Sequence, residues 1–279
     1  MMRSAGKTGV VALAMACWWT VALAEPSSDD GLTLAGLKNI QLVDAGSFVV
    51  AGKPGFAREE TFEFLRRPDG GMTLLSATTL RDGSLRVQTR YDYDADWNAL
   101  RAIGAGIYED EPVTVLLEAK EKHVAVSVRG ESTSIDETVP CPDGCFMDMG
   151  PSGSPMFVMT ERYDHQQGGT QTFRWAAQDL RRAFTSPDNQ RAELTLLREL
   201  PVVRAGGSTV TIREYDMVER VPTPQGGDFV LEFNLWTDGD GRPMGYRINT
   251  AGGKPSESGV LAFRKGFEDV RESVIAARP

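Results

Sequence analysis

The sequence predicts an all-β protein, mainly antiparallel, in which one large curled sheet forms a half barrel or barrel with one or two short helices. Two observations lead to this fold class. About a dozen short segments alternate apolar with polar residues, which is the pattern of half-buried strands. Turn sequences such as Pro68-Asp69-Gly70-Gly71 and Asp238-Gly239-Asp240-Gly241 separate these segments. Many short strands joined by hairpin turns favour a sheet that curls on itself.

The first half of the chain is predicted to consist of strands. The clearest of them places Leu85, Val87, Thr89, Tyr91 and Tyr93 on one face and polar or charged residues on the other. Such alternation indicates one buried face and one face in contact with water. The predicted strands of this half span residues 47–51, 60–67, 72–80, 85–94, 100–108, 113–120, 123–130 and 132–139.

The second half is predicted to contain further strands and two helices. Ser154-Pro155 places an N-cap residue before a proline at the first helical position, which predicts about two helical turns ending at Tyr163. A terminal helix is predicted over Phe267–Ala277. The predicted strands of this half span residues 169–177, 192–199, 208–218, 228–237 and 244–249.

Residues 1–24 are predicted to be a secretory signal peptide. Arg3 and Lys7 precede an apolar run that closes with small residues before Glu25. An alternative makes Cys17 the lipid-bearing cysteine of a lipoprotein, although the residues before it fit such a site poorly. Because no later apolar run is long enough for a membrane helix, residues 25–279 are expected to form one soluble β half-barrel domain, periplasmic or secreted.

The charge of the chain argues against some partners. Loss of the signal peptide removes Arg3 and Lys7 and no acidic residue, so the net charge falls from −9 to −11. A chain this negative repels the phosphates of nucleic acids and anionic membrane surfaces. Nucleic acid is therefore not expected as a partner.

The stretch from Thr138 to Tyr163 interrupts the strands and contains both cysteines of the predicted mature chain. Cys141 and Cys145 flank the turn residues Pro142-Asp143-Gly144, and in an oxidising compartment this arrangement favours a disulfide. A redox or metal pair is the alternative, but a redox site normally has Cys-x-x-Cys at the start of a helix. We therefore predict a disulfide-closed turn that sets the direction in which the chain continues.

The same stretch is rich in methionine. Met147, Met149, Met156, Met159 and His165 include soft ligands of the kind that suits copper(I). The simpler interpretation is that these methionines fill irregular apolar gaps or line a ligand site. No metal and no cofactor is therefore expected.

No catalytic residue is predicted. The segment Gly150-Pro151-Ser152-Gly153-Ser154 is similar to a nucleophile elbow, but its second glycine comes one residue early for Gly-x-Ser-x-Gly. His123 and His165 are the only histidines, and both are expected at the surface. Asp238 and Asp240 lack the later oxygen ligands of a calcium loop and are expected to form a hairpin turn.

Three segments resemble a bacterial family described as glycolipid-binding. They are Arg90–Trp97, Asp143–Met149 with the Ser154-Pro155 pair that follows, and the late hairpin Asp238–Tyr246. The resemblance covers about residues 62–264. It implies a half barrel like those of periplasmic lipoprotein carriers, and a lipid or glycolipid as the ligand. Cys141 and the apolar run Met156–Met159 depart from the family's pattern.

The leading hypothesis is an exported, non-catalytic protein that binds a lipid or glycolipid in the apolar concavity of the sheet. The alternative is a structural or protein-interaction module of the cell envelope, with a filled core and a protein partner. A lesser alternative is an enzyme that acts on envelope glycans or lipids. The residues expected to line the concavity are Met147, Met149, Met156 and Phe157, with Trp97, Trp175 and Trp236 as candidates for its mouth.

Overall fold

The structure is a computed structural model that describes residue 32 and residues 38–51, 57–80, 86–108, 111–150, 152–177, 190–222, 226–251, 254–255 and 260–276. The predicted signal peptide, residues 1–24, and Cys17 lie outside the described residues. The described residues belong to one compact unit. No helix in this part of the chain is long and apolar enough to cross a membrane.

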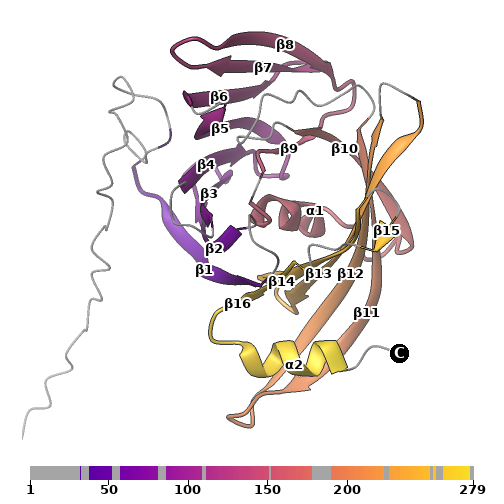
Figure 1. Ribbon diagram of the computed structural model, residues 1–279. Helices are drawn as coiled ribbons and strands as arrows, with labels where there is room; N and C mark the ends of the chain where they lie inside the picture. Colours follow the sequence, from indigo (N-terminus) through magenta and orange to yellow (C-terminus); the bar gives the residue numbers. More distant parts are fainter. Residues whose placement is uncertain are drawn as a thin grey trace, which may run out of the picture. The chain divides into compact units, whose positions relative to one another are not determined.

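Sixteen strands and two short helices make up the described chain (Figure 1). The first strands are β1 (Gln41–Ala51), β2 (Ala57–Arg66), β3 (Met72–Leu80), β4 (Arg86–Tyr93), β5 (Ala99–Tyr108), β6 (Glu111–Ala119), β7 (His123–Arg129) and β8 (Ser134–Pro140). The short strand β9 (Phe146–Asp148), the 3₁₀ turn η1 (Ser154–Met156) and helix α1 (Phe157–Glu161) follow. The last elements are β10 (Thr170–Ala177), β11 (Arg191–Val203), β12 (Thr209–Pro222), β13 (Asp228–Asp238), β14 (Pro243–Ala251), β15 (Lys254–Pro255), β16 (Leu261–Arg264) and α2 (Glu268–Ala276).

The strands form one sheet with two limbs. In the N-terminal limb, β1 to β8 lie side by side in sequence order, and in the C-terminal limb β9 to β14 do the same. Strand β16 lies between β14 and β1 and joins the limbs, because Phe48–Ala51 pair with Leu261–Arg264. Neighbouring described strands are antiparallel except β9 and β10. The order of the described strands ends at β8 and at β9, so the sheet is open, and the predicted half barrel is confirmed.

The alternation of the sequence produces the buried face of the sheet. In β7, Val124, Val126 and Val128 are buried and the residues between them are not. The two tyrosines of β4, Tyr91 and Tyr93, point to the same side as predicted, and both are buried. The buried faces of the two limbs contribute to one large apolar cluster in the interior of the curl.

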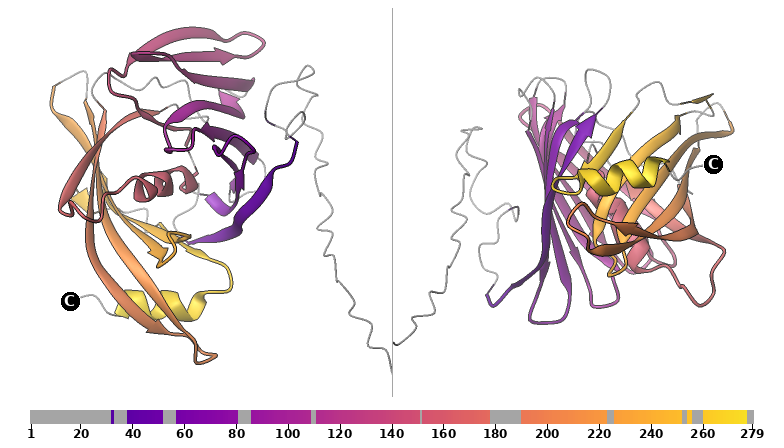
Figure 2. Two further views of the ribbon diagram at one scale, coloured as in Figure 1. Left: turned by 180° about the vertical axis from the view of Figure 1, so that it is seen from behind. Right: turned by 90° about the horizontal axis from the view of Figure 1, so that it is seen from below.

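A short segment lies in this interior, between the limbs. We call residues 152–161, which include η1 and α1, the insert; Figures 1 and 2 show α1 with strands of both limbs on either side. The ring of Phe157 lies 5.8 Å from that of Phe48 in β1. At the start of the insert, Gly153 lies directly against the ring of Tyr246 in β14. The insert is therefore packed against both limbs.

The other face of the C-terminal limb is covered by α2. Trp236, Phe263 and the α2 residues Val270 and Val274 belong to a second, smaller cluster of buried residues. Because side chains alternate along a strand, Leu235 belongs to the interior cluster whereas its neighbour Trp236 lies under α2.

The strands differ from the predicted ones mainly at their ends. Strand β1 begins at Gln41 rather than near Ser47, and β11 continues to Val203, past a register shift between Leu196 and Arg198 that interrupts the alternation. The three strands β9, β15 and β16 were not predicted, since they are too short to show a period. The two predicted helices are present.

An ion pair supports the junction of the limbs. The guanidinium of Arg264 in β16 donates to both carboxylate oxygens of Asp44 in β1, at 2.9 and 2.7 Å, and to the carbonyl of Ala45 at 2.7 Å. Both side chains are largely buried, 13% and 11% exposed. Gly46 leaves room for this contact, because a Cβ there would lie 3.1 Å from Nε of Arg264.

Replacing Arg264 should weaken this junction. In Arg264→Met the carboxylate of Asp44 stays buried without its cation, so we expect the free energy of unfolding to fall by about 3 kcal/mol. Urea denaturation followed by circular dichroism measures this change. Arg271→Met is the matched control, because the pair of Arg271 with Glu272 is exposed and should contribute less than about 1 kcal/mol. Equal losses in the two variants would contradict the assignment.

Candidate functional site

Six of the ten methionines of the chain belong to the interior cluster. Met72 of β3, Met147 of β9, Met159 of α1 and Met217 of β12 come from both limbs and from the insert, and Met149 and Met156 complete the set. All of them are buried. Unbranched thioether side chains adapt to irregular spaces, so this lining can change shape at low cost.

The structure brings most of the predicted lining residues together. Met147, Met149 and Phe157 are at most 1% exposed and Met156 is 6% exposed, all in the interior cluster. Trp175 is buried in the same cluster and Trp97 packs against it. Trp236, predicted at the mouth of the concavity, lies instead on the opposite face, under α2. Phe233 and Leu235 of the same strand belong to the interior cluster, and because side chains alternate along a strand, Trp236 faces the other side.

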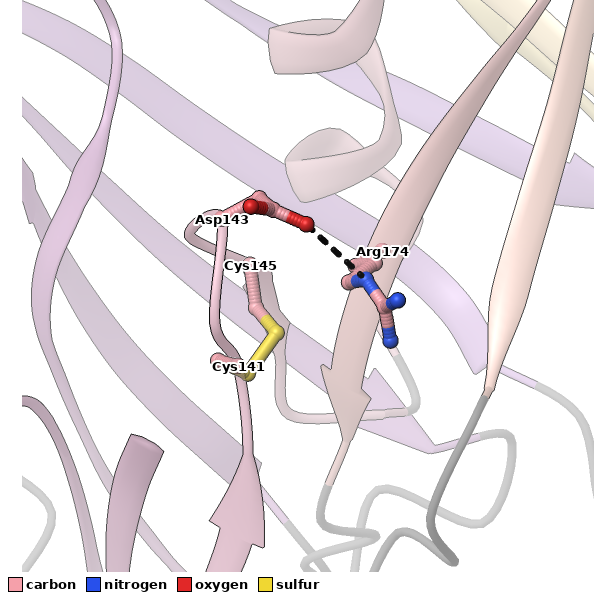
Figure 3. Close-up of a disulfide and its surroundings, with 4 residues drawn as sticks. All are labelled: Cys141, Asp143, Cys145 and Arg174. Carbon is pink, nitrogen blue, oxygen red and sulfur yellow. Dashed lines mark ion pairs between the residues drawn. A yellow bond between two sulfur atoms is a disulfide. The ribbon is translucent and has the colours of Figure 1, made fainter. Parts of the chain in front are cut away.

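The predicted disulfide between Cys141 and Cys145 is present (Figure 3). It closes the turn between edge strand β8 and β9, with 5.7 Å between the two Cα atoms. Gly144 takes a φ of +83°, which favours glycine, and Asp143 lies 3.9 Å from Arg174 of β10. The bridge therefore fixes the point at which the chain leaves the outer edge of the sheet and crosses toward β10.

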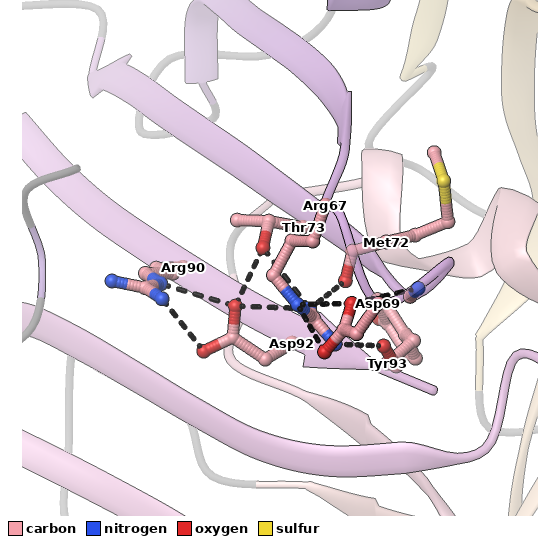
Figure 4. A network of polar contacts seen from close by, with 8 residues as sticks. Arg67, Asp69, Met72, Thr73, Arg90, Asp92 and Tyr93 are labelled. Carbon is pink, nitrogen blue, oxygen red and sulfur yellow. Dashed lines mark hydrogen bonds and ion pairs between the residues drawn. The ribbon is translucent and has the colours of Figure 1, made fainter. Parts of the chain in front are cut away.

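A polar network holds the ends of β2, β3 and β4 together. In Figure 4 the guanidinium of Arg67 donates to the carbonyls of Met72 and Tyr93, both at 2.7 Å. Asp92 accepts from Thr73 at 2.7 Å and pairs with Arg90. The Arg90–Trp97 segment of the family resemblance thus begins in a network that stabilises this corner of the sheet.

Sequence reasoning missed the carboxylates of the interior, of which Glu60 is the more deeply buried. Glu60 of β2 is completely buried and points to the same side as Phe62 and Phe64. Its two oxygens accept hydrogen bonds from the backbone N–H groups of Gly153 and Ser154, at 2.9 and 2.7 Å. Burial raises the pKa of the Glu60 carboxyl above its usual range, and these hydrogen bonds oppose the rise. A charged residue in phase with two phenylalanines was the available signal.

Further polar groups surround the start of the insert. The hydroxyl of Ser152 lies 2.9 Å from that of Ser76 and 2.8 Å from that of Thr78, both in β3. Tyr246 of β14 donates its hydroxyl to Glu60 at 3.5 Å. Its ring lies so close to Gly153 that a Cβ there would be 2.3 Å from it. Ser152, Gly153 and Ser154 of the segment that is similar to a nucleophile elbow are thus buried, and Ser152 lies among hydroxyl groups.

A second buried carboxylate faces the interior from the other limb. Glu219 of β12 is 8% exposed and points to the same side as Met217. Gln190 donates to it at 2.5 Å. Burial raises the pKa of Glu219 to about 7, and the hydrogen bond from Gln190 opposes that rise.

Neither histidine is buried in this interior. His165 is exposed and packs against the rings of Tyr163 and Tyr215, and His123 is half-buried on β7. Asp238 accepts from the backbone of Asp240 and Arg242 and so forms the expected hairpin turn. Among the described residues, no group of three or more His, Cys, Asp or Glu could hold a metal ion.

An open hollow of about 540 Å³ lies on the surface, away from the interior. The turn Arg204–Ser208 and the start of α2 line it. Arg204 there already pairs with Asp269, at 3.4 Å, and lies over the ring of Phe267. These contacts attach α2 to the β11–β12 hairpin, so we assign the hollow no binding role.

Comparison with known proteins shows the fold. No family model and no curated protein matches this sequence. A solved structure, the beta-barrel-like protein of domain of unknown function DUF1849 from Brucella abortus, is 9% identical, with a TM-score of 0.50 over 79% of this chain and 94% of that one. A DUF1089 family protein from Pseudomonas aeruginosa is 15% identical over 72% of this chain and 91% of that one, with a TM-score of 0.34. The first likeness supports the barrel-like fold; membership in a glycolipid-binding family stays a prediction.

The disulfide should contribute modestly to stability. It closes a loop between residues separated by four positions, so the chain-entropy model gives about 2 kcal/mol. We expect the double substitution Cys141→Ser with Cys145→Ser to lower the free energy of unfolding by about that amount. Reduction of the wild-type protein before urea denaturation should give the same loss, and no loss by either route would contradict the estimate.

Glu219 should make stability depend on pH. Because its pKa is raised to about 7, the folded state binds a proton more tightly than the unfolded chain, and the stabilisation is present below about pH 4.5 and lost as the pH rises through 7. The full effect is about 3 kcal/mol. Urea denaturation from pH 5 to 8 should therefore show a flatter profile for Glu219→Gln than for wild type. The raised pKa of Glu60 also makes stability depend on pH, but it does so equally in wild type and variant and therefore cancels. Parallel profiles of the two proteins would contradict the prediction.

Proposed function

We propose that this protein is a non-catalytic binding protein of the cell envelope, periplasmic or secreted, that takes up the apolar chain of a lipid or glycolipid in the interior of the half barrel. The observation that carries the proposal is the lining of that interior. A short insert, and not a further strand, lies in this interior. Methionines from both limbs belong to the same buried cluster as the insert. Such a lining can repack around a flexible chain.

The location rests on two features. The disulfide between Cys141 and Cys145 persists most easily in an oxidising compartment outside the cytoplasm. The sequence of residues 1–24 has the charge and apolar pattern of a signal peptide. Together they support a site of action in the cell envelope, where lipids and glycolipids are available.

The non-catalytic part rests on the placement of the candidate groups. His165 is exposed and His123 is half-buried on β7, so neither is buried in the interior. The hydroxyl of Ser152 is hydrogen-bonded to the hydroxyls of Ser76 and Thr78. A hydroxyl group is too weak a base to activate a serine nucleophile. An enzyme acting on envelope glycans or lipids therefore stays the lesser alternative.

A second function is favoured by one specific observation. Met147, Met149 and Phe157 are at most 1% exposed, so the described interior is filled as a core would be. A filled core fits a structural or interaction module whose function lies on its outer surface and whose partner is another envelope protein. The two functions differ in whether an apolar ligand enters the interior.

Tryptophan fluorescence can test this difference, because Trp175 lies in the interior and Trp236 under α2. Two variants should be prepared in which one of these is the only tryptophan of the chain, the others being phenylalanine. Titration with a brominated fatty acid should quench Trp175 saturably, since quenching needs near contact. Trp236 is the matched control, equally buried on the opposite face, and should keep its fluorescence.

Native mass spectrometry of the purified protein provides an independent measurement. A lipid adduct with defined mass would support the binding function and identify the ligand class.

Equal quenching of both tryptophans in the fluorescence experiment would indicate general loosening of the fold. Absence of quenching at Trp175 together with a bare mass would overturn the lipid-binding function in favour of the interaction module.

A further inference from the structure

The insert has little structure of its own to keep it in place. Its helix α1 has five residues and η1 has three, and helices this short are unstable in isolation. Two of its backbone hydrogen bonds run from Met156 to Gly153 and from Arg162 to Met159, both over three residues. The position of the insert therefore depends on its contacts with the limbs.

The polar contacts are concentrated at its first residues. Glu60 accepts from Gly153 and Ser154, and Ser152 bonds the hydroxyls of β3. Glu60 also contacts Tyr246, so this carboxylate touches the N-terminal limb, the insert and the C-terminal limb. Glu60 is thus the polar attachment that joins the start of the insert to both limbs.

The contacts of the next residues of the insert with the interior are apolar. Phe157, Val158 and Met159 are at most 1% exposed and belong to the interior cluster. Burial of apolar surface is non-directional, so an acyl chain could make equivalent contacts with the same walls. An acyl chain cannot supply the two N–H groups that Glu60 accepts from. The hydrogen bonds to Glu60 therefore distinguish the insert from an apolar ligand, which could replace only the apolar contacts.

We propose that the insert is an internal occupant of the ligand site, and that Glu60 holds it there until an apolar ligand chain displaces it. This inference rests on the proposed function and adds the regulation of the same site. In the free protein the insert fills the interior and protects its apolar lining from water. In the bound protein residues 152–161 leave the interior, and the acyl chain takes the place of Phe157 and its neighbours.

Hydrogen exchange of the full-length protein without ligand tests the role of Glu60. In Glu60→Leu we expect the amides of residues 152–162 to exchange at least about tenfold faster than in wild type. Glu219→Leu is the matched control, because it removes an interior-facing carboxylate whose partner is Gln190 rather than the insert. It should leave exchange in residues 152–162 unchanged.

A second variant displaces the start of the insert and leaves the Glu60 carboxylate in place. In Gly153→Ala the new Cβ would lie 2.3 Å from the ring of Tyr246, so the start of the insert should be displaced and exchange faster in the same way. Exchange at the wild-type rate in both Glu60→Leu and Gly153→Ala would overturn the role of Glu60. The same acceleration in Glu219→Leu would also overturn it, because general destabilisation would then explain the result.

Displacement by ligand is measured separately, with a fluorescent fatty acid as the probe. Saturating probe should accelerate exchange of residues 152–162 in wild type, and Glu60→Leu should bind the probe more tightly, about tenfold by the same hydrogen-bond energies. Slower exchange of these residues with bound probe would overturn displacement. Failure of every variant to bind the probe would overturn the proposed function, whereas the exchange result without ligand would still decide the role of Glu60.

Discussion

The interior of this protein depends on the burial of one carboxylate. A carboxylate removed from water is costly unless donors surround it, and Glu60 finds its donors in the backbone of residues 153 and 154 and in the Tyr246 hydroxyl. Those donors belong to different elements, so satisfying Glu60 brings β2, the insert and β14 to one place. The aromatic contacts of Phe48 with Phe157 and Tyr246 lie around this point.

A methionine-rich core is a compromise between packing and adaptability. Branched side chains have fewer rotamers and would hold the interior in one packed arrangement. Methionine fills irregular gaps but allows several arrangements of the side chains. In this protein Met72 of the N-terminal limb and Met147 and Met217 of the C-terminal limb share one buried cluster with Met156 of the insert. The rigid part of the molecule is the sheet, and the adaptable part is what the sheet surrounds.

The sequence was informative wherever a local pattern determines structure. Alternation predicted most strands, Ser154-Pro155 predicted the helical turn, and Pro142-Asp143-Gly144 predicted the disulfide turn, because each depends on neighbouring residues. A local pattern could not show that the insert would lie inside the curled sheet, since its position depends on contacts between residues that are far apart in the sequence. Glu60 was missed because it is the first residue of the predicted strand 60–67, and a glutamate there was expected to face water.

The junction of the limbs has a consequence for the order of folding. Each limb consists of consecutive hairpins, which form quickly because their contacts are local. The Asp44–Arg264 pair, in contrast, joins residues 220 positions apart. Strand β1 therefore acquires β16 as a neighbour only when the last part of the chain is available. Until then the outer edges of β1 and β14 carry unpaired backbone groups, and an incompletely synthesised chain would expose two edges on which other chains can pair.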